Sequence, residues 1–180
     1  MSADIKLEDT SWVDEKGEIH IEGISLMEQE VVSAVLCNYS KLKQDSFDRF
    51  NSDTYYLVQA FEQVCDKALA DYPLYMKLVE CKIDGLQNVD IQSILEEKFG
   101  IKHSLEYISS LWRNKIPKLI AQKAKEEYLV WYYEHNGLQL KKCSRCGQKK
   151  PAHNDFFSKN KTSKDGYYSI CKCCRNKKRG

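Results

Sequence analysis

Apolar residues recur every three to four positions along most of the chain up to His135, with polar and charged residues between them. This spacing is close to the period of an α-helix that buries one face, about 3.6 residues per turn. Proline and glycine, which interrupt helices, number only 3 and 8 in 180 residues, and most stand between the apolar runs. The helices that the spacing predicts span about 26–43, 53–70, 73–83 and 117–134. The chain is therefore expected to be mainly α-helical.

A pair of short helices is predicted between the third and the fourth of these. The first covers about 88–98, and Gly100 allows the left-handed conformation that ends a helix. Ser104 is a candidate N-cap for the second helix. The residues expected to face inward on this second helix are Leu105, Ile108 and Leu111. Two short helices joined by a glycine turn form a helix-turn-helix, here expected at about 85–116.

The segment 1–24 is acidic and less regular. Trp12-Val13 and Ile19-His20-Ile21 flank a polar turn, an arrangement typical of a small hairpin. The opening MSADIKLEDT contains no apolar run, so a signal peptide is not expected. No segment approaches the roughly 20 apolar residues of a membrane helix. We expect a cytoplasmic protein with an acidic segment at 1–24, a helical domain at 25–137 and a small module at 138–180.

The small module contains two CxxC pairs, Cys143/Cys146 and Cys171/Cys174, separated by the segment 147–170. Each CxxC turn aims two thiolates at one ion, and two such turns complete the tetrahedral shell of a zinc site. A module of about forty residues with few apolar side chains needs a crosslink of this kind to fold. Two disulfides are the alternative, which a reducing compartment disfavours.

Two further residues compete for the same role. His153, seven positions after Cys146, is a possible fourth ligand, and Cys173 lies inside the second pair. The choice of Cys171 with Cys174 repeats the spacing of the first pair. The predicted ligands of Zn²⁺ are therefore Cys143, Cys146, Cys171 and Cys174. Whether Cys173 or His153 can replace one of them stays open.

The remaining cysteines and one aromatic stripe are assigned to the protein interior. Cys37, Cys65 and Cys81 each fall among the apolar residues of a predicted helix, so we expect them to be small core residues. A stripe along the last helix is predicted to be core or a dimer seam rather than a platform for stacking bases. Its members are Ile120, Ala124, Tyr128, Trp131 and Tyr132.

Charge divides the chain sharply. Residues 141–180 contain 13 lysines and arginines against Asp155 and Asp165, a net of +11. The whole chain carries +2, so residues 1–140 carry −9. A basic block on a zinc module is typical of phosphate binding. Solubility alone is the competing explanation, and the run 175–179 exceeds what it requires.

The residues of the helix-turn-helix segment resemble a known family. The matching positions are Gly85-Leu86, Ile91, Leu95, Gly100-Ile101, Ser104, Ile108 and Leu111. They resemble the helix-turn-helix of sigma-factor region 4 and of related response-regulator DNA-binding domains. The chain departs from that family where Gln92 replaces the usual alanine and where residues 96–99 lengthen the first helix.

The tail resembles zinc-ribbon-like modules of phage and prophage proteins, some of which precede endonuclease-VII-type domains. The matching residues are Cys143, Cys146, Gly147, Lys150, Pro151, Phe157, Asp165, Gly166, Tyr167, Cys171, Lys172 and Cys174. Together the two resemblances imply a DNA-binding protein of a phage or mobile element. Its location would be the bacterial host cell or its nucleoid.

The resemblance makes the helix after Ser104 the recognition helix, which would lie in the major groove of double-stranded DNA. Arg113 would read guanine and Asn114 adenine, while Lys115 and Lys118 would contact phosphate. The nucleic-acid contacts predicted on this helix are Ser104, Glu106, Ser109, Ser110, Arg113, Asn114, Lys115 and Lys118. Those predicted on the basic module are Arg145, Lys149, Lys150, Lys172, Arg175, Lys177, Lys178 and Arg179. Stacking of bases on Tyr167 or Tyr168 is a further possibility.

An enzyme is not expected. A nuclease of the endonuclease-VII type needs a general base and metal ligands supplied by histidines and similar residues, and the four histidines form no cluster in the sequence. The function expected is sequence-specific DNA binding in transcription regulation. The alternatives are a genome-packaging or recombination accessory, a zinc-dependent protein-interaction module or homodimer, and a nuclease-related protein. RNA in place of DNA also stays open.

Overall fold

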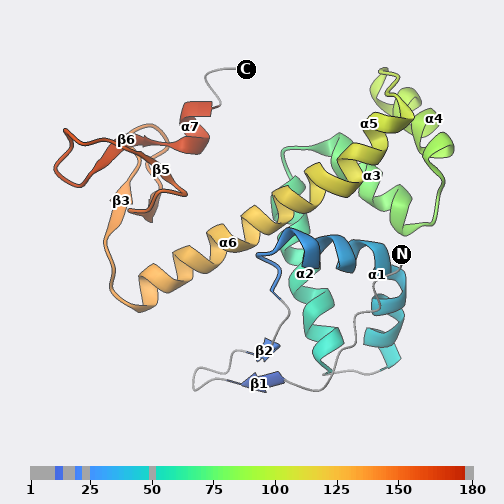
Figure 1. Cartoon of the computed structure of the whole chain (residues 1–180), viewed down its shortest axis with the longest axis horizontal. Coiled ribbons are helices and arrows are strands. Elements are labelled where there is room, and N and C mark those ends of the chain that lie inside the picture. Colours follow the sequence, from blue (N-terminus) through green and yellow to red (C-terminus); the bar gives the residue numbers. More distant parts are fainter. Residues whose placement is uncertain (1–10, 14–18, 22–24, 49–51, 177–180) are drawn as a thin grey trace. The chain divides into compact units, whose positions relative to one another are not determined.

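The computed structural model describes residues 11–13, 19–21, 25–48 and 52–176 of the chain. It is mainly helical, with a small β-containing region around four C-terminal cysteines (Figure 1). The predicted fold class is therefore confirmed. None of the helices in the described ranges combines the length and the apolar content that crossing a bilayer requires.

The chain divides into two compact units, residues 1–124 and 125–180. The division falls within one helix rather than at its end, where the sequence pattern places the boundary between domains. In the first unit a short antiparallel pair joins β1 (Ser11–Val13) to β2 (Ile19–Ile21). The other regular elements of the described first unit are helices.

Helices α1 (Gln29–Asp48), α2 (Asp53–Leu69) and α3 (Pro73–Ile83) lie close to the predicted spans. The hydroxyl of Ser52 caps α2 by accepting a hydrogen bond from the backbone N–H of Tyr55 at 3.2 Å. Pro73 occupies the first turn of α3, where its missing N–H costs nothing. Helix α1 packs mainly against α2.

Helices α4 (Asn88–Phe99) and α5 (Leu105–Ser110) follow, as the sequence predicts. Gly100 ends α4 in the left-handed conformation with φ +71°, and its N–H donates to the carbonyl of Glu96. Ser104 then caps α5 through a hydrogen bond from the N–H of Tyr107 to its hydroxyl. The two helices are therefore short, in contact and joined by a tight connection.

The helix after α5 corrects one expectation. The sequence predicts a break before a new helix at Pro117, but α5 runs through a π-helical turn, η1 (Leu111–Lys115), into α6 (Ile116–His135). The N–H of Ile116 donates to the carbonyl of Leu111, five positions back. Because proline cannot donate to the residue four positions before it and its ring crowds that carbonyl, a wider turn just before Pro117 lets the helix continue.

The core of the first unit contains residues from all of these helices. Its largest buried side chains include Phe61, Leu69, Leu78, Ile91, Leu95, Ile108, Ile116 and Ile120. Cys65 and Cys81 are buried as predicted, but Cys37 is exposed, so its assignment to the core is wrong. Leu105, expected to face inward, lies in the first turn of α5 and is 36% exposed, since only Ile108 and Leu111 reach the core.

The second unit consists of the end of α6, two hairpins and a short helix. The first hairpin pairs β3 (Leu140–Lys142) with β4 (Lys149–Pro151), and the second pairs β5 (Phe157–Lys159) with β6 (Tyr167–Cys171). The short helix α7 (Lys172–Asn176) follows β6 directly. The cysteines lie at the turn of the first hairpin and at the junction of β6 with α7.

Candidate metal centre

The first cysteine pair occupies the turn between β3 and β4. Cys143 donates its backbone N–H to the carbonyl of Gln148 at 2.9 Å and accepts at its own carbonyl from Gly147 at 2.9 Å. Gly147 has φ +72°, a conformation that a side chain disfavours. The glycine after the CxxC sequence therefore lets the chain turn sharply while both sulfurs stay on the same side.

The second pair lies where β6 becomes α7. Cys171 is the last residue of β6 and Cys174 lies in α7, so one helical turn brings the two sulfurs together. The N–H of Lys172 donates to the carbonyl of Phe156 at 2.8 Å, which fixes this junction against the start of β5. The N–H of Cys171 points at the sulfur of Cys143 at 3.3 Å.

The four sulfurs converge on one point. The Sγ atoms of Cys143, Cys146, Cys171 and Cys174 all lie within 4.8 Å of one another, so the group could hold a metal ion. Cys143 and Cys171 are buried, Cys174 is half-buried and Cys146 is exposed. One side of the cluster therefore faces the module interior and the other faces solvent.

The thiols differ in how readily they ionise. Burial raises the pKa of Cys143, but the backbone N–H groups of Cys146, Cys171 and Arg145 point at its sulfur and lower the pKa to about 6. A hydrogen bond with Cys171, together with burial, raises the pKa of the Cys174 thiol to about 12. In the folded module Cys143 is therefore a thiolate near neutral pH, which is the form in which a cysteine would bind a cation.

A small apolar core supports the cysteines. Phe157 is fully buried and Phe156 nearly so, beside Cys143 and Cys171. Leu129 and Val130, from the second half of α6, pack against this group. The cluster of thiols therefore rests on a core that the helix before the module helps to complete.

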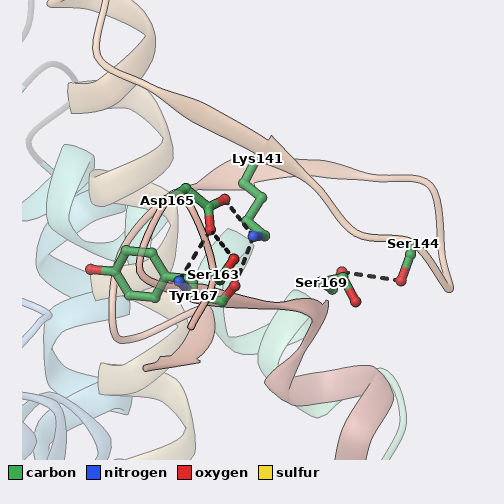
Figure 2. A network of polar contacts seen from close by, with 6 residues as sticks. All are labelled: Lys141, Ser144, Ser163, Asp165, Tyr167 and Ser169. Atoms are coloured by element: carbon green, nitrogen blue, oxygen red, sulfur yellow. Dashed lines mark hydrogen bonds and ion pairs between the residues drawn. The ribbon is translucent and has the colours of Figure 1, made fainter. Parts of the chain in front are cut away.

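Figure 2 shows a polar network that holds the two hairpins together. The ammonium group of Lys141 in β3 pairs with the carboxylate of Asp165 and donates to the carbonyl of Tyr167 at 2.9 Å. Asp165 also accepts from the hydroxyl of Ser163 at 2.8 Å and from the N–H of Tyr167 at 3.1 Å. Led by the contact with Lys141, these hydrogen bonds lower the pKa of Asp165 to about 2.

The structural role of Lys141 and Asp165 is not evident from the sequence. There Lys141 is simply part of a basic run, and Asp165 is a motif position. The lysine side chain is only 13% exposed, and its ammonium lies 5.7 Å from the centre of the Phe157 ring. Lys141 is therefore a structural residue inside the module. The sequence contains one sign of this role: Lys141 and exposed Lys142 are adjacent in a strand, so their side chains lie on opposite faces.

The two rival ligands lie outside the group of four sulfurs. Cys173 is exposed and is not a member of the cluster, although it stands between two members in sequence. His153 instead accepts a hydrogen bond at Nδ1 from the N–H of Asp155 at 3.2 Å, and its ring meets that of Tyr133 edge-on. The structure thus gathers the four cysteines that the sequence predicts.

The basic side chains of the module are largely at its surface. Lys150 and Lys172 are half-buried, while Arg145, Lys149 and Arg175 are exposed. Three other predicted contacts, Lys177, Lys178 and Arg179, lie outside the described residues. The basic side chains therefore lie on the surface of the module and not among the sulfurs of the cysteine cluster.

The predicted contacts on α5 and the following turns occupy varied environments. The exposed ones are Glu106, Ser110, Arg113, Asn114, Lys115 and Lys118, and Ser109 is half-buried. Ser104 is engaged as the cap of α5. The N–H of Glu106 and the hydroxyl of Ser104 also hold the Glu106 carboxylate and lower its pKa. Arg113 approaches Lys82 in α3, whose pKa is lowered by burial and by this neighbouring charge.

The departure at Gln92 has a visible role. Its side-chain amide donates to the backbone carbonyl of His103, in the connection between α4 and α5. The His103 ring in turn stacks on that of Tyr107, with 4.8 Å between ring centres. At the position where the helix-turn-helix domains it resembles have alanine, this chain therefore has a side chain that ties α4 to the connection before α5.

No protein-family model, curated protein or solved structure matches the chain. The two family resemblances drawn from its motifs stay predictions.

Proposed function

We propose that the four clustered cysteines hold a zinc ion. Thiolates are soft ligands, and a closed set of four is typical of structural zinc. With Zn–S bonds of about 2.3 Å, the sulfurs of a tetrahedral site lie about 3.8 Å apart, and the present separations are at most 4.8 Å. Zinc would supply a crosslink between the β3–β4 turn and the start of α7.

On this basis we propose that the protein binds double-stranded DNA and does not act as an enzyme. The observation that carries the proposal is the surface of the cysteine module, where Arg145, Lys149 and Arg175 are exposed around the thiol cluster. A dense positive charge on a small rigid unit favours phosphate. The segment 1–140 carries −9, so phosphate affinity would come chiefly from this module.

Sequence reading is assigned to the helix pair α4–α5, used as a helix-turn-helix. Arg113 and Asn114 are exposed after α5, and their side chains match the edges of guanine and adenine. Glu106 stays ionised and exposed, and a carboxylate can accept from the amino group of cytosine. Lys115 and Lys118 would contact phosphate and set the orientation without reading bases.

The test is unbiased selection of bound DNA by the intact protein and by two variants. Arg113→Ala should relax the selected sequence and cost about 1–3 kcal/mol at the preferred site. Lys118→Ala, the matched control, should weaken all sequences alike and leave the selected sequence unchanged. If the Arg113→Ala selection matches that of the intact protein, the assignment of the recognition helix is wrong.

Salt dependence tests the role of the basic module. If the protein neutralises six or more phosphates, its affinity for duplex DNA should fall about 1,000-fold between roughly 50 and 200 mM salt. Replacement of both Lys149 and Lys150 by alanine should lower the slope of log affinity against log salt by about 2. Affinity that hardly changes with salt would exclude phosphate binding by this surface.

The biological role that fits best is transcription regulation in a bacterial cytoplasm or nucleoid, by the resemblance to phage and mobile-element proteins. A packaging or recombination accessory would use the same contacts with DNA and would differ in its sequence preference.

A protein-interaction function has one observation in its favour. Tyr128 and Tyr132, predicted to be core or seam, are exposed and stacked on the second half of α6. Light scattering of Tyr132→Glu against the intact protein tests whether this stripe joins two copies.

A further inference from the structure

A hollow of about 240 Å³ opens on the surface of the cysteine module. The residues that line it are Arg145, Tyr168, Ser169, Ile170 and Arg175. Tyr168 and Ile170 are exposed large side chains, at 44% and 37%. The hollow is smaller than the roughly 300–1,000 Å³ typical of sites for drug-sized ligands, so it suits a single ring-sized group.

The backbone around the hollow is fixed. The N–H of Ser144 donates to the carbonyl of Ser169 at 2.9 Å. The hydroxyl of Ser144 donates to the same carbonyl at 3.2 Å (Figure 2). Arg145 donates to the carbonyl of Cys174. These bonds tie the first CxxC turn to β6 and to α7, so the lining residues are held by the same elements that hold the sulfurs.

The lining combines flat surfaces with positive charge. The guanidinium of Arg175 lies over the Tyr168 ring, 4.9 Å from its centre. Within the described ranges no carboxylate pairs with Arg145 or Arg175. Unpaired bases stack on aromatic rings such as that of tyrosine and on guanidinium planes, and arginines without a carboxylate partner attract phosphate. The group that matches is a flat ring joined to an anion.

We propose that this hollow binds an unpaired nucleotide, with its base against Tyr168 and Arg175 and its phosphate near Arg145. The inference rests on the proposed nucleic-acid function and extends it, because a base within an intact duplex is stacked on its neighbours and cannot enter. The protein would therefore bind a duplex that carries a single-stranded overhang more tightly than the same duplex with blunt ends.

The test measures fluorescence anisotropy of the full chain with labelled oligonucleotides at one salt concentration. The probes are a blunt DNA duplex, the same duplex with an unpaired overhang, and single-stranded DNA and RNA of the overhang sequence. The overhang should raise affinity about tenfold. Tyr168→Ala should lower the affinity for the overhanging duplex more than that for the blunt duplex, so that the gain is lost, whereas Tyr168→Phe should keep it. Tyr72→Ala, an equally exposed tyrosine in the other unit, is the matched control.

The outcomes separate the two proposals. Equal affinity for blunt and overhanging duplexes, or an overhang gain that survives Tyr168→Ala, overturns the hollow as a nucleotide site and leaves duplex binding intact. A chain that binds none of the four probes overturns duplex binding and the hollow together. Zinc content is measured for every variant. Arg175→Gln removes the stacked guanidinium without changing a cysteine, and it must also reduce the increase in affinity that the overhang produces. DNA and RNA strands that differ in affinity identify the natural source of the nucleotide.

Discussion

At the scale of single residues, the cysteine cluster separates sulfurs that belong to the site from one that does not. Cys173 is flanked by ligand candidates, yet its side chain is exposed and outside the group. The junction of β6 with α7 explains this, since one helical turn separates Cys171 from Cys174, whereas Cys173 is adjacent to Cys174 and lies on a different face of the turn. Sequence spacing alone favours the same four residues, because the second pair then repeats the first.

Replacing single cysteines tests this selection. Cys143→Ser should reduce bound zinc to below about 0.3 per chain, because three thiolates and a weak hydroxyl ligand cannot close the shell. Cys173→Ser should keep about one zinc per chain. Metal analysis of the purified, reduced proteins decides between them. Zinc loss in both variants, or in neither, would contradict the assignment.

The ionisation of Cys143 gives a prediction about pH. In the metal-free chain, where this module is expected to be unfolded, all four thiols keep their protons below about pH 8. Zinc binding should therefore release close to four protons per chain at both pH 5 and pH 7, and zinc affinity should fall steeply as the pH is lowered. In the folded module the pKa of Cys143 is lowered to about 6, so a module that folds before metal binds would release about one proton fewer at pH 7 than at pH 5. Proton release in weakly buffered solution, measured at both pH values, distinguishes the two cases.

At the scale of helices and strands, local signals predicted most of the first unit. The caps at Ser52 and Ser104 and the stop at Gly100 act within one turn of the chain, so the sequence displays them directly. The π-turn at Leu111–Lys115 could not be predicted in this way. Proline permits either a new helix or a wider turn, and burial of Ile116 in the core favours the continuous helix.

Contacts between distant elements were the least predictable. Lys141 and Asp165 lie 24 positions apart, and no local pattern pairs them. The exposure of Cys37 and Leu105 likewise depends on which neighbouring helix covers each position. The hollow beside Tyr168 combines Arg145 with Arg175, which only the approach of the two cysteine turns brings together.

The buried ring of Phe157 provides a test at this scale. Phe157→Ala removes the fully buried aromatic side chain beside Cys143 and Cys171, and such changes cost about 3–5 kcal/mol. The variant should lose zinc to a chelator much faster than the intact protein. Phe47→Ala, at a phenylalanine that is 74% exposed, should release zinc at the unchanged rate. Similar rates for Phe157→Ala and the intact protein would exclude a supporting role for this core.

At the scale of the whole molecule, the two units have separate sources of stability. The first unit has a continuous apolar core drawn from α1 to α6, and none of the four clustered cysteines belongs to it. The second has few buried side chains and relies on its cysteines and on the Lys141–Asp165 network. A small unit with so little core is expected to depend on the proposed metal for its fold.

Removing the metal should therefore unfold one unit and not the other. A strong chelator under reducing conditions should abolish DNA binding that depends on the basic module and leave most of the helical circular dichroism signal intact. Restoring zinc should recover binding. Simultaneous loss of the whole helical signal would mean that the units do not fold independently.

The packing of Leu129 and Val130 on the cysteine module has a practical consequence for dividing the protein. A fragment that starts at β3 would contain every cysteine of the cluster and every residue of both hairpins, yet two apolar partners of Phe156 and Phe157 would be missing. Such a fragment would expose aromatic surface and tend to aggregate during expression. A fragment that starts at Lys125 retains those partners, and it is the appropriate starting point for spectroscopy of the isolated module.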